Sequence, residues 1–504
     1  MPSAAPSKEP PLLPSNCPTC EGLLLAGVSA TFRCIPPARE LSFHFAGDSR
    51  SAHSRTPRQP RSWRERQAAS PVWACLLLGC TGPAGVNRGS QPKEECAGVR
   101  SLFIAYLVWF RYGFFIVFLY AVLVALGNLR KGYRPGSHPA SKRFAVLVPA
   151  HNEERVIADL LRDLRAMEYP SHLYRVYVIA DNCNDATAAI ARSEGVTVLE
   201  RRTAGMSSKG EALSWALERI DADYDAYVVF DADNRVAPTF LKRANDALCE
   251  GARLVQCYLA IKNPNDNWVT RALYLHQEVT NHLWHAGKHA LGLGNYLVGT
   301  GMVISADLLT KHAWEAESLT EDLEYTLRMA LEGHSVVWLS DVAVYDEKPS
   351  DLKSTYVQQQ RWMIGTWKCF QKYFLPVLRK GVAERRADIV DLALYLFAPV
   401  WIVMNVVYGA ANLINSAFNI VVFPPDPAVT VAGTVFGLAY FAAGLRMAGI
   451  PVLKNLALVL VLLALYPTAA TVQVVWGLFR INERRWYHTP HGAKLDPEIR
   501  LGSE

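Results

Sequence analysis

The chain has 504 residues, enough for more than one domain. Its 52 basic and 46 acidic residues leave a formal charge of +6, which is mild for this length and does not indicate nucleic-acid binding. Hydrophobic residues make up 51% of the chain, and several apolar runs are long enough to cross a bilayer, which excludes a purely soluble nucleotide-binding module.

The N-terminal part predicts a tail followed by a membrane helix. Residues 1–98 are rich in Pro, Ser and Arg and show no sustained apolar periodicity, so we expect a disordered tail. Residues 101–129 are almost continuously apolar and predict a transmembrane helix. A cluster of basic residues follows at once: Arg130, Lys131, Arg134, Lys142 and Arg143. This cluster places the downstream side of the helix in the cytoplasm.

Residues 140–350 predict a soluble α/β domain in which strands and helices alternate. The expected strands are Phe144–Val148, Arg175–Ala180, Val196–Leu199 and Ala226–Phe230. The expected helices between them are Glu153–Glu168, Asp185–Glu194 and Lys209–Arg219. This alternation predicts βαβ units and a mostly parallel sheet. In such sheets, ligands bind beyond the carboxyl ends of the strands.

The C-terminal part returns to the membrane. Residues 351–386 predict charged interfacial helices, residues 389–479 about three transmembrane helices, and residues 480–504 a basic tail. Basic residues before 389 place the start of the first late span inside, so three spans would leave the tail outside. That result conflicts with the excess of basic residues expected on the cytoplasmic side. The number of late spans therefore stays open.

Paired acids follow the fourth expected strand. Asp231 and Asp233 come directly after the apolar run Tyr227–Phe230. Hard divalent cations take oxygen ligands and are commonly shared with substrate phosphates, so this pair suits a metal. An Asp-x-Asp triplet is weak evidence alone, but polar residues also follow the first and second strands, at 149–153 and 181–185. The three strand ends together predict one site.

Two further groups suit a nucleotide. Asp181 ends the second strand, where its carboxylate can accept a hydrogen bond from a base, whereas Asp185 fits the role of helix cap better. Lys209 begins a helix, and helix N-terminal N–H groups with one lysine suit a pyrophosphate. An ordinary capped helix with an exposed lysine fits the same pattern, so both interpretations of Lys209 remain open.

A second acidic pair lies at an expected helix start. Ser318 and Glu321 have the spacing of a capping box, and acids are favoured in a first helical turn in any case. A carboxylate anchored there is well placed as a general base, and we assign that role to Asp322. Gly299-Thr300-Gly301 marks a place where the backbone can approach a ligand closely.

Gln358, Arg361 and Trp362 share one face of an expected helix because they stand at positions i, i+3 and i+4. An amide, a fork-shaped cation and a flat ring on one face suit the recognition of phosphate and sugar. A helix lying beside the membrane would also favour Arg and Trp, so this second interpretation stands beside the first.

These motifs occur in the order seen in family-2 inverting glycosyltransferases, and the chain resembles the membrane-embedded polysaccharide synthases of cellulose, hyaluronan, chitin and poly-N-acetylglucosamine. The motifs are Val148–Glu154, Asp181, Asp231-Ala-Asp233, Thr320-Glu321-Asp322 and Gln358-x-x-Arg361-Trp362. The likeness covers roughly residues 143–368. Asn182 departs from it, because the family more commonly has glycine there. The resemblance implies a Rossmann-like nucleotide-diphospho-sugar transferase domain inserted between transmembrane helices.

The resemblance also implies roles. Asp181 would contact the base, Asp231 and Asp233 would position the nucleotide and hold Mg²⁺ or Mn²⁺, and Asp322 would accept the proton of the acceptor hydroxyl. Glu153 and Lys209 would join the nucleotide-sugar site. The residues expected around the diphosphate and acceptor are Gln358, Arg361, Trp362, Glu321, Gly299, Thr300 and Gly301.

We therefore expect a membrane-bound inverting glycosyltransferase that moves a sugar from a UDP-sugar to a growing β-linked glycan. One alternative is a single addition to a lipid or lipid-phosphate acceptor, and another is an inactive transporter or scaffold. The expected setting is a multi-pass plasma-membrane protein with its catalytic domain in the cytoplasm, where sugar nucleotides are made. Its partners would be donor, acceptor and bilayer, with room for accessory membrane subunits and no nucleic acid.

Overall fold

The computed structural model describes residues 91–130, 133–204, 208–220, 223–315, 317–418, 427–482, 491–499 and 501. Most of the expected N-terminal tail, residues 1–90, lies outside them. Helix α2 (Gln91–Gly127) includes residues 91–98, which the sequence analysis assigned to that tail. The physical reason is that this stretch contains good helix formers and leads directly into the apolar run.

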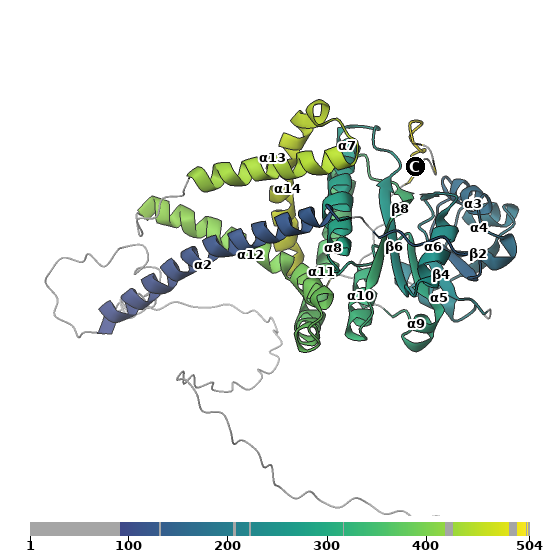
Figure 1. The fold of residues 1–504 in the computed structure, drawn as a ribbon, viewed down its shortest axis with the longest axis horizontal. Helices are drawn as coiled ribbons and strands as arrows, with labels where there is room; N and C mark the ends of the chain where they lie inside the picture. Colours follow the sequence, from purple (N-terminus) through teal and green to yellow (C-terminus); the bar gives the residue numbers. More distant parts are fainter. Residues whose placement is uncertain are drawn as a thin grey trace, which may run out of the picture. The chain divides into compact units, whose positions relative to one another are not determined.

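The domain is built on one sheet of eight strands in the order β3-β2-β1-β4-β7-β6-β8-β5 (Figure 1). The strands are β1 (Phe144–Ala150), β2 (Tyr174–Asp181), β3 (Thr197–Arg201), β4 (Ala226–Val229), β5 (Arg235–Val236), β6 (Leu254–Ile261), β7 (Met302–Ser305) and β8 (Val336–Asp346). Four of the seven pairings are parallel, and β7 runs antiparallel to both of its neighbours. The expectation of a Rossmann-like, mostly parallel sheet is confirmed.

Helices cover both faces of this sheet, and strand β1 is therefore buried on both sides. Val146 and Val148 belong to one hydrophobic core, which includes α3 (Ile157–Arg165), α4 (Thr187–Ser193) and α6 (Phe240–Cys249). Ala145 and Leu147 point into a second core with α5 (Lys209–Leu217), α9 (Ala306–Lys311) and α10 (Glu321–Leu331). Successive side chains of a strand face opposite ways, which explains its continuous apolar sequence.

The remaining described elements lead towards the apolar helices. They are η1 (Ser171–Leu173), α7 (Trp268–Val279), the π-helix η2 (Thr280–Ala286), α8 (Gly287–Ala290), α11 (Leu352–Ala383), α12 (Ala387–Phe418), α13 (Pro427–Met447) and α14 (Val452–Phe479). Three described stretches are long and apolar enough to cross a membrane: Ile104–Gly127, Ala387–Ala417 and Val452–Phe479. The apolar part of α13, Val431–Met447, is shorter.

Helix α2 packs against both α12 and α13. The ring of Phe110 stacks on that of Trp401 in α12, with 4.7 Å between their centroids. The hydroxyl of Tyr120 donates to Asp391, ten residues earlier in α12, so α2 and α12 run antiparallel. The ring centroids of Phe118 and of Phe436 in α13 lie 4.1 Å apart. These three apolar helices therefore lie beside one another.

Helix α14 is different, because both of its ends contact helices of the domain side. Near its start, the Nε atom of Arg271 in α7 donates to Asn455 Oδ1 at 3.2 Å. Near its end, Trp367 Nε1 of α11 donates to the carbonyl of Val474 at 2.9 Å. In Figure 1, α14 runs across α13 rather than along it. A helix of this length measures about 42 Å, and α14 extends along the domain rather than away from it.

Candidate active site

A cleft of about 850 Å³ lies beyond the carboxyl ends of β1, β2 and β4. It is lined by all but one of the side chains and glycines expected from the sequence: Glu153, Asp181, Lys209, Asp231, Asp233, Gly299, Thr300, Glu321, Asp322, Gln358, Arg361 and Trp362. The loops after three neighbouring strands, the segment before β7 and the helices α5, α10 and α11 bring these residues together. This arrangement is the one that the strand ends predicted.

Gly301 is the exception, and it does not line the cleft. Its N–H donates to the carbonyl of Val229 at 2.9 Å, and its φ angle is +59°. A Cβ atom there would lie 2.3 Å from Cys257 Sγ. Glycine is required at 301 because β4, β6 and β7 pack closely, so its expected role in ligand binding is wrong.

Asp181 is held at the end of β2 by an arginine of the neighbouring strand. Its side chain is 9% exposed, and Arg201 Nη1 donates to its Oδ1 atom at 2.9 Å. Asn182 follows with a φ angle of +50°, and its side chain exchanges two hydrogen bonds with Thr203, at 2.9 and 3.0 Å. Asparagine tolerates this left-handed conformation, which explains how it can occupy a position where glycine is commoner.

Lys209 points into the cleft. The helix α5 that it begins is capped by Ser208, which forms a capping box with Glu211. Lys209 Nζ donates to the carboxylate of Asp231 and, at 2.8 Å, to the carbonyl of Gly299. Burial lowers the pKa of Lys209, but nearby carboxylates, Asp231 first, outweigh it and raise that pKa. Of the two interpretations left open by the sequence, the structure places this lysine inside the site.

Asp322 occupies the first turn of α10, and its Oδ1 atom accepts a hydrogen bond from the N–H of Leu323 at 2.7 Å. Burial, followed by the charge of Glu321, raises the pKa of Asp322 to about 7. A carboxyl group with this pKa can accept a proton near neutral pH and is stronger as a base than an ordinary aspartate. Asp322 therefore combines a position in the cleft with a raised pKa.

The expected capping box at Ser318 does not form. Helix α10 begins at Glu321 with Thr320 at the cap position, so Ser318 lies too early in the chain to cap it. Instead, Glu324 Oε2 accepts hydrogen bonds from the N–H groups of Glu317 and Ser318, at 2.9 and 2.8 Å. The acid that organises this loop is therefore Glu324, one turn further into the helix.

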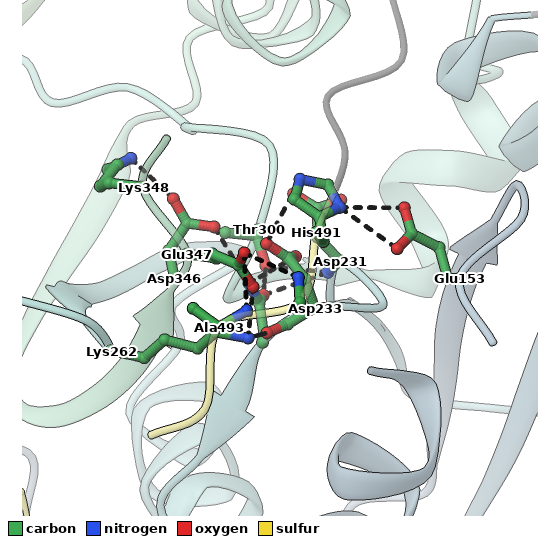
Figure 2. A network of polar contacts seen from close by, with 12 residues as sticks. Glu153, Asp231, Asp233, Lys262, Thr300, Asp346, Glu347, Lys348, His491 and Ala493 are labelled. Carbon is green, nitrogen blue, oxygen red and sulfur yellow. Dashed lines mark hydrogen bonds and ion pairs between the residues drawn. The ribbon is translucent and has the colours of Figure 1, made fainter. Parts of the chain in front are cut away.

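Asp233 and His491 form the polar centre of the site (Figure 2). Asp233 Oδ2 lies 3.7 Å from His491 Nε2, and His491 Nδ1 lies 3.0 Å from Glu153 Oε1. Burial raises the pKa of Asp233 to about 7. Burial also lowers the pKa of His491, but the surrounding carboxylates, Asp233 first, outweigh it and raise that pKa to about 10.

Main-chain and lysine contacts hold the C-terminal segment, residues 491–499, in this position. The N–H groups of Gly492 and Ala493 donate to Glu347 Oε1 at 2.9 and 3.0 Å, and the N–H of Asp496 donates to the carbonyl of Lys262 at 2.8 Å. Lys262 Nζ in turn donates to the carbonyl of Asp233 at 2.7 Å. The segment therefore docks on the same loops that carry the acids.

His491 was expected to belong to the basic tail, and its place in the site was not predicted from the sequence. Its own neighbourhood gives no signal, because a single histidine in a polar segment resembles any surface histidine. Its partners come from loops that are remote in sequence. Within the described residues, no group of three or more His, Cys, Asp or Glu side chains is already arranged as a metal site. Asp233 and His491 place a carboxylate oxygen and an imidazole nitrogen side by side, and these donor types suit a divalent cation that takes further oxygens from a ligand.

Helix α11 contributes the opposite wall of the cleft. Trp362 is 41% exposed, and its ring centroid lies 5.7 Å from Lys348 Nζ. The Nε atom of Arg361 is buried but has no hydrogen-bond partner among the described residues. Because a buried guanidinium N–H rarely stays unpaired, this atom is suited to a ligand oxygen.

Comparison with known proteins agrees with this geometry. Residues 139–365 match the family model described as "Glycosyltransferase like family 2". The beta-monoglucosyldiacylglycerol synthase of Trichormus variabilis is 30% identical over 250 residues, which cover 48% of this chain and 53% of that protein. The probable glucomannan 4-beta-mannosyltransferase 1 of Arabidopsis thaliana is 27% identical over 248 residues, covering 46% and 44%. The chain thus spans about half the length of these curated relatives.

Among solved structures, a mannosyltransferase from Pyrobaculum calidifontis, determined in complex with GDP-Man and Mn²⁺, has a similar fold. It matches with a TM-score of 0.52 and 17% identity, over 74% of this chain and 99% of that chain. At this identity the likeness supports the fold alone.

Proposed function

We propose that residues 139–365, which match the model of a glycosyltransferase family, form a family-2 glycosyltransferase domain that transfers a sugar from a nucleotide diphosphate to an acceptor hydroxyl with inversion. The observation that carries the proposal is that Asp322, the proposed base, and the cation of Lys209 both lie beside Gly299. A Cβ atom at Gly299 would lie 3.2 Å from Asp322 Oδ2 and 3.6 Å from Lys209 Nζ. A proton acceptor and a diphosphate-binding cation thus lie close together in one cleft.

The donor would bind along the strand ends. Asp181, fixed by Arg201, would accept a hydrogen bond from the base, for which we propose uracil. Lys209 and Arg361 would contact the diphosphate from opposite walls. Asp233 and His491 would hold Mg²⁺ or Mn²⁺, with the carboxylate of Asp231 close to that of Asp233. When bound, such a cation would neutralise charge on the leaving diphosphate.

The residues of the chain account for the remaining chemistry. Asp322 would accept the proton of the acceptor hydroxyl as its oxygen attacks the anomeric carbon. Lys209, held between Asp231 and the carbonyl of Gly299, would stay charged and stabilise the departing diphosphate. A single displacement inverts the anomeric centre, so an α-linked donor gives a β-linked product.

Two acceptors fit this mechanism. A membrane lipid is favoured by an apolar cavity that adjoins the cleft, and the name of the Trichormus relative agrees with it. A growing β-linked glycan, as in a polysaccharide synthase, is favoured by Gln358, Arg361 and Trp362 on one face of α11, and the name of the Arabidopsis relative agrees with that. We put the lipid first because this cavity offers an apolar binding site beside the cleft. In either case the domain would lie in the cytoplasm at the plasma membrane.

The proposal is tested by nucleotide release from membranes that contain the full-length protein. A panel of UDP-sugars is supplied with Mg²⁺ or Mn²⁺, and chelated samples serve as controls. We expect release with one donor, and its loss on chelation. Sizing of the labelled product then separates single addition from a polymer ladder. Failure to release nucleotide from every donor, with lipid and glycan acceptors both present, would overturn the proposal.

A further inference from the structure

We infer that the acceptor is a membrane lipid whose apolar chain binds in a cavity between the α7–η2 segment and α13. This inference rests on the proposed function and extends it to the acceptor. The cavity, which we call the annex, measures about 190 Å³. Its lining residues are His276, Val279, Thr280, Trp284, Tyr296, Tyr440 and Phe441.

The annex adjoins the catalytic cleft, because Thr280 and Tyr296 line both. The ring of Tyr296 stacks on that of Tyr395 at 4.4 Å, and both rings line the cleft that contains Asp322. On this proposal, a molecule whose hydroxyl lies at Asp322 would extend past Tyr296 to reach the annex.

The chemistry of the annex suits a hydrocarbon chain better than a glycan. Its lining residues include no Asp, Glu, Lys or Arg. The hydroxyl of Thr280 already donates to the carbonyl of His276 at 2.9 Å, and burial lowers the pKa of His276 to about 4, which keeps its ring neutral. Sugar hydroxyls placed there would find few partners, and an unpaired buried hydroxyl is costly. An apolar chain needs none.

The annex also lies where a lipid chain can reach it. Tyr440 and Phe441 belong to α13, whose Val431 and Val435 are about 60% and 59% exposed, so this helix presents apolar side chains to its surroundings. On the domain side, Gly444 allows α13 to approach closely, since a Cβ atom there would lie 2.9 Å from Val279 Cγ2. Tight packing at Gly444 thus closes the annex towards the domain, and the annex lies against an apolar helix.

A second observation singles out the same segment. Thr280, which both cavities share, is the first residue of the π-helix η2. A π-helical turn inside an α-helical segment is uncommon and is often found at functional sites. Here the wider turn comes at the junction of the cleft and the annex. The backbone therefore changes from an α-helix to a π-helix at the residue that both cavities share.

The test uses the full-length protein in phosphatidylcholine nanodiscs with the UDP-sugar that supports turnover. Two probes carry the same hydroxyl: 1,2-dioleoylglycerol, which has acyl chains, and glycerol, which has none. Phe441→Trp narrows the annex, Phe441→Leu keeps it open and apolar, and Phe436→Trp is the matched control on α13, where Phe436 faces Phe118 instead. Transfer into organic-extractable product and acceptor-free release of UDP are both measured.

We expect wild type to prefer dioleoylglycerol over glycerol. Phe441→Trp should lower kcat/KM for dioleoylglycerol about tenfold, the usual size of a steric change in an apolar pocket. Its acceptor-free release of UDP should stay unchanged, which shows that the variant is folded, and Phe441→Leu and Phe436→Trp should transfer like wild type. The inference is overturned if Phe441→Trp also transfers like wild type, or if wild type makes only a water-soluble glycan. Absence of any UDP release by wild type would overturn the proposed function itself.

Discussion

His491 Nε2 lies 3.7 Å from Asp233 Oδ2, although the helices α12, α13 and α14 separate the two residues in sequence. This contact ties the end of the described chain to the acids at the end of strand β4. It also joins a nitrogen donor to the carboxylates already recognisable in the sequence. A polar tail thereby becomes part of the candidate active site.

Replacement of His491 should weaken metal binding. His491→Ala removes one of two protein donors, and we expect the affinity for Mn²⁺ to fall roughly tenfold or more, since even indirect metal partners are typically worth that much. Because the pKa of His491 is about 10, Mn²⁺ must displace a proton, and wild-type affinity should rise with pH. Calorimetric titration at several pH values checks both expectations. Unchanged affinity in His491→Ala, with His334→Ala as control, would remove this residue from the metal site.

The activity should depend on pH through Asp322. Its pKa of about 7 means that the carboxylate, the form that can accept a proton, predominates only above neutral pH. We therefore expect kcat/KM to rise as the pH rises through about 7 and then to level off. Asp322→Asn should lose this dependence together with most of its activity. A wild-type profile that falls over the same range would contradict the assignment of Asp322 as the base.

Gly299 and Gly333 provide a matched pair of backbone tests. Both have a φ angle of +85°, so alanine is strained equally at either position. At Gly299 the added methyl group also lies 3.2 Å from Asp322 Oδ2, whereas at Gly333 no atom lies within 4 Å. Gly299→Ala should lower kcat about a hundredfold by displacing the base, and Gly333→Ala should not. Both variants should lose similar stability, which thermal unfolding measures. Equal activity of the two would show that Gly299 serves the turn alone.

The position of α14 predicts on which side of the membrane the C-terminal segment lies. If α2, α12 and α13 cross the bilayer while α14 stays along the domain, the C-terminal segment ends on the side of the domain. Cysteines placed at Glu498 and at Glu218 of the domain should then react with an impermeant maleimide from one side, and a cysteine at Ser416 near the far end of α12 from the other. Labelling of Glu498→Cys from the same side as Ser416→Cys would show that α14 spans the membrane.

The sequence predicted the parts of the fold that depend on local pattern. Apolar runs alternating with helix-forming stretches located β1 to β4 and α3 to α5, and the polar strand ends located the cleft. It did not reveal β7, whose four residues, Met302–Ser305, run antiparallel between β4 and β6. Short strands of this kind are specified by their neighbours in the sheet rather than by their own periodicity.

The residues of the candidate site likewise fall into those that local sequence pattern reveals and those that only the packing of the fold reveals. Asp231, Asp233 and Asp322 were recognisable because their motifs are contiguous. Gly301 was misassigned because a glycine needed for packing looks the same in sequence as a glycine that faces a ligand. The topology was ambiguous because α14 is long and apolar enough to span, and its contacts with Arg271 and Trp367, which place its two ends against α7 and α11, cannot be read from the sequence.

The most direct test of the central claim compares wild type with Asp322→Asn in acceptor-dependent release of UDP, while donor binding is measured in parallel. Loss of a general base should lower kcat roughly a hundred- to ten-thousand-fold and leave the Kd for UDP unchanged. That result would establish the cleft as the site of transfer and Asp322 as its base. Release of UDP at the wild-type rate by Asp322→Asn would contradict the account.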